Sequence, residues 1–115
     1  MINEIVRALK SRPLPLNDEK ELQAEISKLL ESRGIPHKRE VGLGDGDVID
    51  FMLPDGIGME IKIKAPKRQI YRQCKRYCGH AQLRTLVLVS ATAMGLPVQI
   101  DGKDCYYVSL GAGWL

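Results

Sequence analysis

Apolar residues alternate with other residues on both sides of the sequence Leu53-Pro54-Asp55-Gly56-Ile57. A period of two is typical of a β-strand, and Pro, Asp and Gly in succession are typical of a tight turn. We therefore predict a β-hairpin over Asp47–Lys64, with a type I turn closed by a left-handed Gly56. Such a turn sets the register, so that three pairs of residues face each other: Leu53 with Ile57, Met52 with Gly58, and Asp50 with Glu60.

Apolar residues at a spacing of three and four predict two helices before this hairpin. A short amphipathic helix lies within residues 1–12. A second begins after the N-cap Asp18, with Glu21 as its capping-box partner, and ends near Arg33, just before Gly34. The buried stripe of this second helix comprises Leu22, Ile26, Leu29 and Leu30.

A third helix opens at Pro66 and ends near Cys78, where Gly79 stops it. The segment Gly42–Asp47 is expected to be a flexible loop that leads into the hairpin. Other apolar runs predict further strands, namely Ile35–Val41 at a sheet edge, the fully buried run Thr85–Ser90, and the shorter strands Pro97–Asp101 and Cys105–Leu110. This order of elements favours an α/β fold with a mixed central sheet of about four to six strands and helices on its faces.

The length of the chain, 115 residues and 12.8 kDa, is typical of one domain over residues 1–115. No apolar run approaches the ~20 residues of a membrane span. The first residues also lack the basic start and long apolar core of a signal peptide. We therefore expect a cytoplasmic protein that does not enter membranes.

Positive charge is concentrated in one part of the chain. Residues 61–100 contain eight Lys and Arg and no acidic residue, although the net charge of the whole chain is only +3. Residues 1–60 contain eight basic and twelve acidic residues. A basic stretch of this kind is expected where a polyanion such as DNA binds. The expected phosphate contacts are Lys64, Lys67, Arg68, Arg72, Lys75 and Arg76.

Asp50, Glu60 and Lys62 share one face of the predicted hairpin, because residues that are opposite or two apart point to the same side. Two carboxylates so close together are costly unless a divalent cation neutralises them. We therefore expect a Mg²⁺ or Mn²⁺ site here. Asp45 and Asp47 are alternatives to Asp50, but the turn register places Asp50 across from Glu60.

An Asp followed after nine residues by Glu-x-Lys across a hairpin resembles the signature of the PD-(D/E)xK nuclease superfamily. The flanking segments match as well, because an amphipathic helix precedes the hairpin and a basic helix with Gln73-x-x-x-Tyr77 follows it. The resemblance covers about residues 17–91 and is nearest to small nucleases of the VRR-NUC and Holliday-junction-resolvase types. It implies a restriction-endonuclease-like αβββαβ core and metal-dependent hydrolysis of DNA phosphodiester bonds. It also implies a structure-selective enzyme, acting on flaps or junctions as a homodimer.

The resemblance assigns roles to the hairpin residues. Asp50, Glu60 and the backbone carbonyl of Ile61 would bind Mg²⁺. Lys62 would orient or deprotonate the attacking water, or would stabilise charge on the phosphate. Lys64, on the same face, is the alternative for the role of Lys62.

The resemblance also assigns roles to the two neighbouring helices. Gln73 and Tyr77 would face the active-site cleft and orient the substrate or a metal-bound water. Related nucleases often carry an acid on the helix before the hairpin, and Glu19, Gln23 and Glu25 all flank the buried stripe there. Gln23 lies nearest the usual acid position, and Glu25 is the other candidate helix ligand. A solvated helix surface is the alternative for these acids.

The three cysteines are an odd number and indicate no disulfide framework. Cys74 and Cys78 fall on the apolar stripe of the third helix together with Ile70 and Tyr77. We therefore expect buried thiols and not a zinc site shared with His80.

Two alternatives to a nuclease remain open. A non-catalytic nucleic-acid-binding domain that keeps the nuclease fold would explain the basic stretch and the lack of a clear helix acid. A structural or assembly protein would have its hairpin carboxylates facing solvent. In the tail Gly111–Leu115, Trp114 would form a contact surface if it is not buried, in agreement with subunit pairing.

Overall fold

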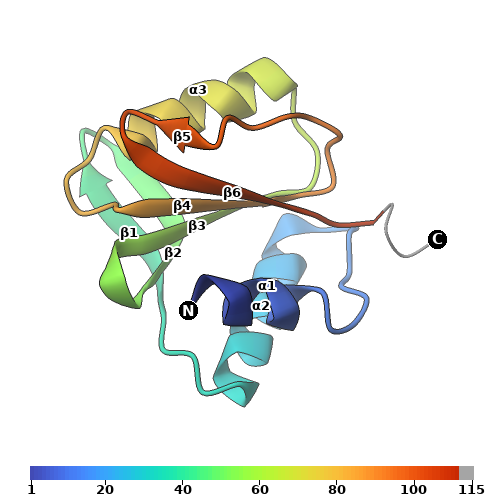
Figure 1. Ribbon diagram of the computed structural model, residues 1–115. Helices are drawn as coiled ribbons and strands as arrows, with labels where there is room; N and C mark the ends of the chain where they lie inside the picture. The colour runs from blue at the N-terminus through green and yellow to red at the C-terminus, as the bar shows by residue number, and fades with distance from the viewer. Residues whose placement is uncertain (112–115) are drawn as a thin grey trace.

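Six strands form one mixed sheet in the order β1-β2-β3-β4-β6-β5, with helices on both faces (Figure 1). The computed structural model describes residues 1–111, so the expectation for Trp114 concerns a residue outside the described part of the chain. The predicted α/β class and mixed sheet are confirmed. The strands are β1 (Lys38–Gly44), β2 (Asp47–Leu53), β3 (Ile57–Lys62), β4 (Thr85–Ser90), β5 (Gln99–Ile100) and β6 (Lys103–Ser109).

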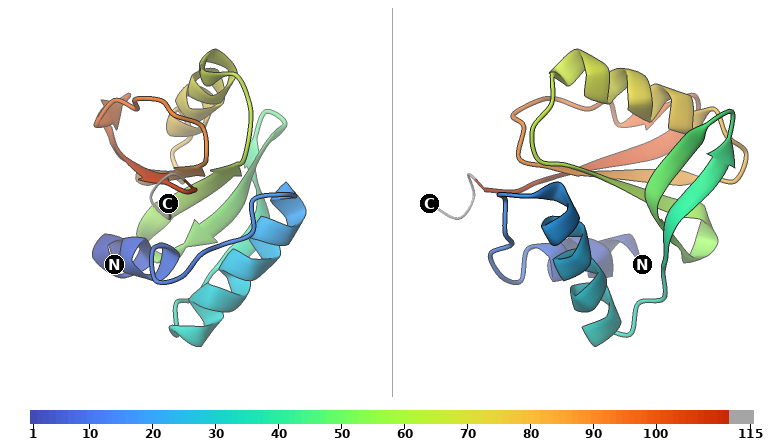
Figure 2. Two further views of the ribbon diagram at one scale, coloured as in Figure 1. Left: turned by 90° about the vertical axis from the view of Figure 1, so that its right-hand side faces the viewer. Right: turned by 180° about the vertical axis from the view of Figure 1, so that it is seen from behind.

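The helices α1 (Ile2–Leu9) and α2 (Glu19–Ser32) cover one face of the sheet, and α3 (Lys67–Cys78) covers the other (Figure 2). Asp18 caps α2, because its carboxylate accepts a hydrogen bond from the backbone N–H of Lys20 at 3.0 Å. Among the described residues Glu21 makes no reciprocal bond, so the predicted capping box does not form.

Two hydrophobic cores lie on opposite faces of the sheet. The predicted stripe of α2 is buried against Phe51, Met59 and Ile61 on one face. Ile70, Cys74 and Cys78 of α3 are buried on the other face, and the expectation of buried thiols is confirmed. The central strand β4 alternates between them, with Val87 and Val89 in the first core and Leu86 and Leu88 in the second. A strand buried on both faces and parallel to its neighbours is what the continuous apolar run predicts.

The hairpin of β2 and β3 has the predicted register, with Leu53 opposite Ile57 and Met52 opposite Gly58. Its turn, the short 3-10 segment η1 (Pro54–Gly56), differs from the prediction. Gly56 is left-handed as expected, with φ 71°, but Asp55 is left-handed too, with φ 65° and ψ 28°. The turn is therefore not type I, and it is tolerated because Asp is one of the few residues that adopt this conformation readily.

The edge strand β1 differs from its predicted bounds of Ile35–Val41, because it begins at Lys38 and continues to Gly44. Its place at a sheet edge is confirmed. The predicted flexible loop Gly42–Asp47 is wrong. Asp45 and Gly46 have φ 56° and 80° and form a two-residue turn, which joins β1 directly to β2. Two left-handed residues match the twist of the flanking strands, and Asp-Gly is a sequence suited to such a turn.

The bounds of β3, β5 and β6 also differ from the predicted bounds. β3 ends at Lys62 and does not reach Lys64, where the predicted hairpin ends. At the far edge, β5 has only two residues and β6 begins at Lys103, because Asp101 and Gly102 are both left-handed and make a second two-residue turn.

Strand β1 is distorted at one residue, Glu40, which has a left-handed backbone with φ 53°. The pairs on either side, Arg39 with Phe51 and Val41 with Ile49, place Glu40 opposite Asp50. A left-handed backbone costs a non-glycine residue about 1–2 kcal/mol, so the surrounding structure must stabilise it. The distortion therefore lies on the strand next to the candidate site.

Candidate active site at the carboxylate pair

At the ends of β2 and β3, the carboxylates of Asp50 and Glu60 accept hydrogen bonds from backbone N–H groups, in place of the backbone carbonyls of the sheet. The pairing of these strands ends at Phe51 and Met59. Beyond that point the backbone N–H of Asp50 donates to Oε1 of Glu60 at 3.2 Å, and the backbone N–H of Ile61 donates to Oδ2 of Asp50 at 2.8 Å. Each carboxylate therefore accepts from a backbone group of the facing strand, and the two carboxylates lie together as the register predicts.

Burial makes this pair hard to ionise. The side chain of Glu60 is only 4% exposed. Burial and, after it, the charge of Asp50 raise the pKa of Glu60 to about 8, although Lys62 opposes both effects. Burial also raises the pKa of Asp50, against the hydrogen bond from Ile61. A proton therefore stays on the pair near neutral pH when no other cation is bound.

Lys62 is the lysine that the structure brings to the pair. Its Nζ lies 3.5 Å from Oε2 of Glu60, and its side chain is 23% exposed. Lys64, the alternative, lies beyond the end of β3 and is exposed. Lys62 therefore combines contact with the carboxylates and access to solvent.

Gln73 and Tyr77 approach the pair from α3. Nε2 of Gln73 donates to the Tyr77 hydroxyl at 2.8 Å, and that hydroxyl donates to the backbone carbonyl of Val48 at 2.9 Å. Tyr77 is fully buried, and burial followed by the charges of Glu60 and Asp50 raises its pKa. Tyr77 is thus a buried tyrosine that ties α3 to β2 and also lies close to the carboxylates. Gln73 is half-buried beside it.

On α2 the acid that approaches the pair is Glu19. Its Oε2 accepts a hydrogen bond from the backbone N–H of Ile63, just after β3, at 3.4 Å. Its negative charge is also among the causes that raise the pKa of Asp50. The sequence placed Glu19 on the flank of the buried stripe together with two other residues. It could not single out Glu19, because the choice depends on how α2 crosses the end of β3.

The two residues predicted as helix ligands lie elsewhere on α2. Gln23 is buried and accepts a hydrogen bond from Nη2 of Arg39 at 3.4 Å. Glu25 forms ion pairs with Arg12 at 3.4 Å and with Lys28 at 3.5 Å. Among the described residues, neither forms a hydrogen bond or ion pair with Asp50 or Glu60.

Asp47 holds the tip of the β1–β2 hairpin against α3. Its carboxylate accepts from Nε of Arg76 at 3.1 Å and from Nε2 of His80 at 2.9 Å. The hydrogen bond from His80, assisted by Arg76, lowers the pKa of Asp47. Asp47 is therefore engaged in an ion pair and is separate from the carboxylate pair. The sequence gave no signal for this contact, because His80 lies 33 residues away.

The donor atoms at the pair suit a hard cation. Asp50, Glu60 and the Ile61 carbonyl offer oxygen atoms, and Mg²⁺ commonly uses one or two carboxylates and keeps several waters. Within residues 1–111, no group of three His, Cys, Asp or Glu side chains is placed to hold a metal ion. The residues present therefore fit Mg²⁺ with few protein ligands, and they do not form a closed metal cage.

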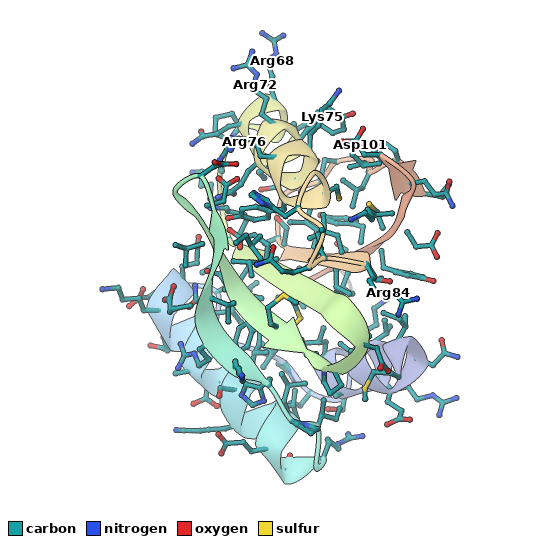
Figure 3. The ribbon with its side chains drawn as sticks, turned by 90° about the vertical axis from the view of Figure 1, so that its left-hand side faces the viewer. Arg68, Arg72, Lys75, Arg76, Arg84 and Asp101 are labelled. Carbon is teal, nitrogen blue, oxygen red and sulfur yellow. The ribbon has the colours of Figure 1, made fainter. Side chains whose placement is uncertain are left out.

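Basic residues follow the outer side of α3. Figure 3 shows Arg68 and Arg72 projecting from one end of the helix, with Lys75 and Arg76 further along it and Arg84 apart from them. All of the predicted phosphate contacts are exposed: Lys64, Lys67, Arg68, Arg72, Lys75 and Arg76. Arg76 differs from the others because it is paired with Asp47.

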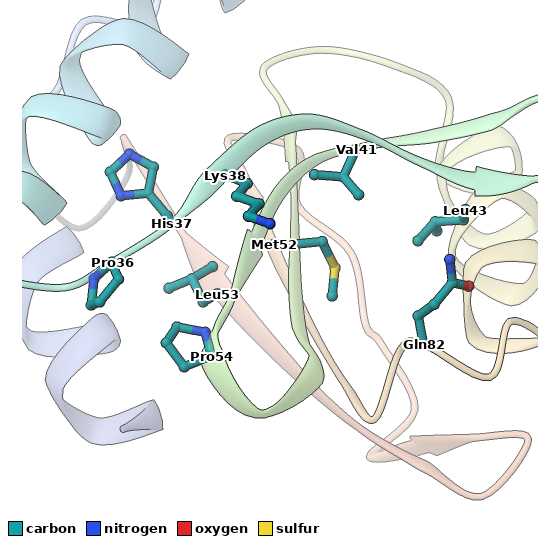
Figure 4. Close-up of a pocket in the computed structure, with 9 residues that line it drawn as sticks. All are labelled: Pro36, His37, Lys38, Val41, Leu43, Met52, Leu53, Pro54 and Gln82. Carbon is teal, nitrogen blue, oxygen red and sulfur yellow. The ribbon is translucent and has the colours of Figure 1, made fainter.

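Two cavities lie near the hairpin. The larger, of about 460 Å³, is lined mainly by apolar side chains of β1, β2 and the turn after β2 (Figure 4). No residue of the carboxylate pair lines it. The smaller, of about 140 Å³, lies between the end of β3 and α3, and we call it the α3 pocket. It is lined by Lys62, Ala65, Gln69, Ile70, Gln73 and Arg76.

Comparison with protein families, with curated proteins and with solved structures finds no match to this chain. Over residues 1–111, none of the helices has the length and apolar character needed to cross a membrane. The carboxylate pair and the basic helix beside it are therefore the features from which a function can be inferred.

Proposed function

We propose that this chain is a metal-dependent nuclease of the PD-(D/E)xK type that hydrolyses DNA phosphodiester bonds. The observation that carries the proposal is the exchange of carboxylate hydrogen bonds between β2 and β3, with Lys62 3.5 Å from Glu60. The order α2-β1-β2-β3-α3-β4 agrees with the αβββαβ core of restriction-endonuclease-like enzymes. Gln73 and Tyr77 occupy the expected helix and are bonded to each other.

Asp50, Glu60 and the Ile61 carbonyl would hold Mg²⁺ or Mn²⁺ in this enzyme. A metal bound there would polarise a phosphoryl oxygen and make a bound water more acidic. Glu19 is the helix acid that could add an oxygen ligand, in place of Gln23 or Glu25, because it reaches the backbone directly after β3. The buried pair gives up its remaining proton when the metal binds, since a carboxylate ligand must be ionised.

Lys62 would act on the reacting phosphate. Its ammonium group can orient the attacking water or stabilise negative charge as it develops in the transition state. Its partial burial strengthens either effect, because the effective dielectric constant is lower there than in water. Tyr77, fixed by Gln73 and Val48, would keep α3 at a constant distance from this group.

The exposed basic residues of α3 would bind the DNA backbone. Lys and Arg contacts to phosphates position a duplex without reading its sequence, and such binding weakens steeply with salt. The proposed substrates are flaps or junctions, cut by a homodimer, as the resemblance to small junction-cleaving nucleases implies.

The proposal is tested by cleavage of labelled single-stranded, duplex, flapped and four-way-junction DNA, with Mg²⁺, Mn²⁺ or chelator. We expect cleavage that requires metal. Lys62→Ala should lower its rate by about 10²–10⁴-fold, as expected for a group that acts in the transition state. Lys64→Ala is the matched control, because it removes the same charge two residues away, and it should change the rate by less than about tenfold.

A non-catalytic nucleic-acid-binding domain is the second candidate. It is favoured by the lack, within residues 1–111, of a third side chain placed to complete a metal site. Salt-sensitive binding of DNA without cutting under either metal would support it against the nuclease. A thermal-shift measurement separates the nuclease from both the binding domain and a purely structural protein, because only for the nuclease should Mg²⁺ raise the melting temperature of the wild type and not that of Asp50→Ala.

A further inference from the structure

We propose that the α3 pocket is a binding site for a single phosphate group of a nucleic-acid strand, distinct from the carboxylate pair. Two cationic side chains and two amide side chains line it: Lys62, Arg76, Gln69 and Gln73. No acidic residue lines it. Cations and amide N–H groups are the donors that recognise phosphate oxygens.

The size of the α3 pocket selects a small anion. Its volume of about 140 Å³ is well below the ~300–1,000 Å³ of pockets that enclose whole small-molecule ligands. A tetrahedral phosphate group with a few waters fits this space.

Arg76 is oriented toward this role by its ion pair. Its Nε donates to Oδ1 of Asp47 at 3.1 Å, so one edge of the guanidinium group is used by the protein. Within the described residues its two Nη groups have no side-chain partner, and the residue lines the α3 pocket. A planar guanidinium held at one edge offers parallel N–H groups to an anion at lower entropic cost than a free arginine. Among residues 1–111, Arg72, one turn earlier, has no acidic partner of this kind.

The amide residues lie on the same flank of α3 as Arg76. Gln69, Gln73 and Arg76 follow each other at spacings of four and three residues, so their side chains form one row along the helix. Gln73 is fixed by its bond to the Tyr77 hydroxyl, and its second N–H remains available. Lys62 closes the row from β3.

Lys62 connects the α3 pocket to the carboxylate pair, because it lines the one and lies 3.5 Å from the other. A strand whose phosphate occupies the pocket is thereby placed beside Asp50 and Glu60. The binding itself does not depend on the proposed nuclease activity. It can be measured in chelator, where no cleavage occurs, so that failure of either proposal can be recognised separately.

The first experiment is calorimetric titration of inorganic phosphate into the whole chain in chelator, with chloride at equal ionic strength as reference. Arg76→Gln should weaken phosphate binding by at least about tenfold, because a charge-assisted hydrogen bond is lost. The matched control Arg72→Gln removes the same charge from the same helix and should weaken it by less than about threefold. Equal losses in the two variants would show charge screening alone and would overturn the proposal.

A second variant is needed because Arg76→Gln also breaks the ion pair with Asp47 and could disturb folding. Gln69→Leu leaves that ion pair intact, and Gln69 is exposed, so folding should be unaffected. It should still weaken phosphate binding by about three- to tenfold through the loss of one neutral hydrogen-bond donor. Unchanged binding in Gln69→Leu would also overturn the proposal.

The source of the phosphate is found with short single-stranded oligonucleotides that carry a 5′-phosphate, a 3′-phosphate or only hydroxyl ends. A preference for one phosphorylated end that Arg76→Gln abolishes and Arg72→Gln preserves would identify a terminal phosphate. Equal binding of all three, weakened more by Arg76→Gln than by Arg72→Gln, would identify a backbone phosphate. Binding of all three that Arg76→Gln and Arg72→Gln reduce equally would contradict the site.

Discussion

Strand β3 is paired differently along its two sides. On the β4 side, every residue of Ile57–Lys62 has a partner in Thr85–Ser90. On the β2 side, the pairing stops at Met59, and the carboxylates of Asp50 and Glu60 take over the backbone N–H groups beyond it. A polar site can therefore form on one side of β3 because the other side of the strand remains fully paired.

The two sides of β3 also differ in the polarity of the residues that they contact. The partner strand β4 carries Leu86, Val87, Leu88 and Val89, which are all fully buried. Burial of such side chains contributes about 1.5–3 kcal/mol each. On the β2 side, two carboxylates lie together, largely away from solvent. This costs free energy unless a proton or a cation neutralises their charge. Stability therefore comes mainly from one side of β3 and the candidate chemistry from the other.

The largest effect is expected from Asp50→Asn on cleavage. Asn keeps the size of the side chain and can still accept from the Ile61 N–H, but it removes a charged oxygen ligand. Cleavage of the preferred DNA in Mg²⁺ should fall by about 10²–10⁴-fold in single-turnover assays. Asp55→Asn, in the turn at the far end of the hairpin, should leave the rate unchanged. A rate for Asp50→Asn within tenfold of the wild type would remove this residue from the site.

Leu88→Ala tests the other side of β3. It removes a fully buried side chain from the core next to α3, and should lower the free energy of unfolding by about 2–5 kcal/mol. Val98→Ala is the control, because Val98 is 81% exposed, and its effect should stay within about 0.5 kcal/mol. Urea unfolding followed by circular dichroism measures both. A loss below 1 kcal/mol for Leu88→Ala would show that the packing of β4 does not dominate stability.

Gly58→Ala tests how tightly β3 itself is packed. A Cβ at Gly58 would lie 2.2 Å from Cδ1 of Leu83 and 2.6 Å from Cδ1 of Ile49. Such overpacking should cost about 1–3 kcal/mol in urea unfolding. Gly42→Ala on the edge strand is the matched control, because its Cβ would meet no atom within 4 Å. Equal costs for the two variants would contradict the close packing described for Gly58.

The smallest effect is expected from pH, measured in chelator. The pKa of Glu60 is raised to about 8 in the folded protein, against 4.5 for an ordinary glutamate. The folded state thus binds a proton more tightly than the unfolded state, so the stability from this group is complete below pH 4.5 and declines as the pH rises to about 8. Glu60→Gln should reduce this decline and gain about 1–2 kcal/mol at pH 9, partly offset because Lys62 loses its partner.

Thermal unfolding from pH 5 to pH 9 measures this difference. Glu25→Gln, which alters a partly exposed ion-paired carboxylate on α2, serves as the control and should leave the slope unchanged. An identical slope in the wild type and Glu60→Gln would show that the buried pair does not hold a proton at neutral pH.

The hairpin and its carboxylates could be predicted from the sequence because the controlling information is local. A short turn between two alternating runs fixes the register, and the register alone brings Asp50 opposite Glu60. The helix bounds could be predicted for the same reason, since caps and stripes are properties of neighbouring residues. The Asp45-Gly46 turn has an equally local signal, because Asp-Gly is typical of a two-residue hairpin turn. The prediction of a flexible loop was based on the glycine content of the segment and did not use this signal.

The parts of the site that could not be predicted depend on the placement of whole elements. The choice of Glu19 over Gln23 follows from where α2 crosses the end of β3. The contact of Asp47 with Arg76 and His80 joins residues 29 and 33 positions apart. No periodicity or turn signal encodes such distances, because they are set by how α3 packs on the sheet.

The short turn between β2 and β3 also has a kinetic consequence. Asp50 and Glu60 are only ten residues apart, so they meet as soon as the hairpin closes, which takes about 1–10 µs for an isolated hairpin. The covering helix α3 and the strand β4 must close longer loops and therefore arrive later. The two like charges thus oppose each other early in folding, before burial raises their pKa, and refolding should be faster in acid than at neutral pH.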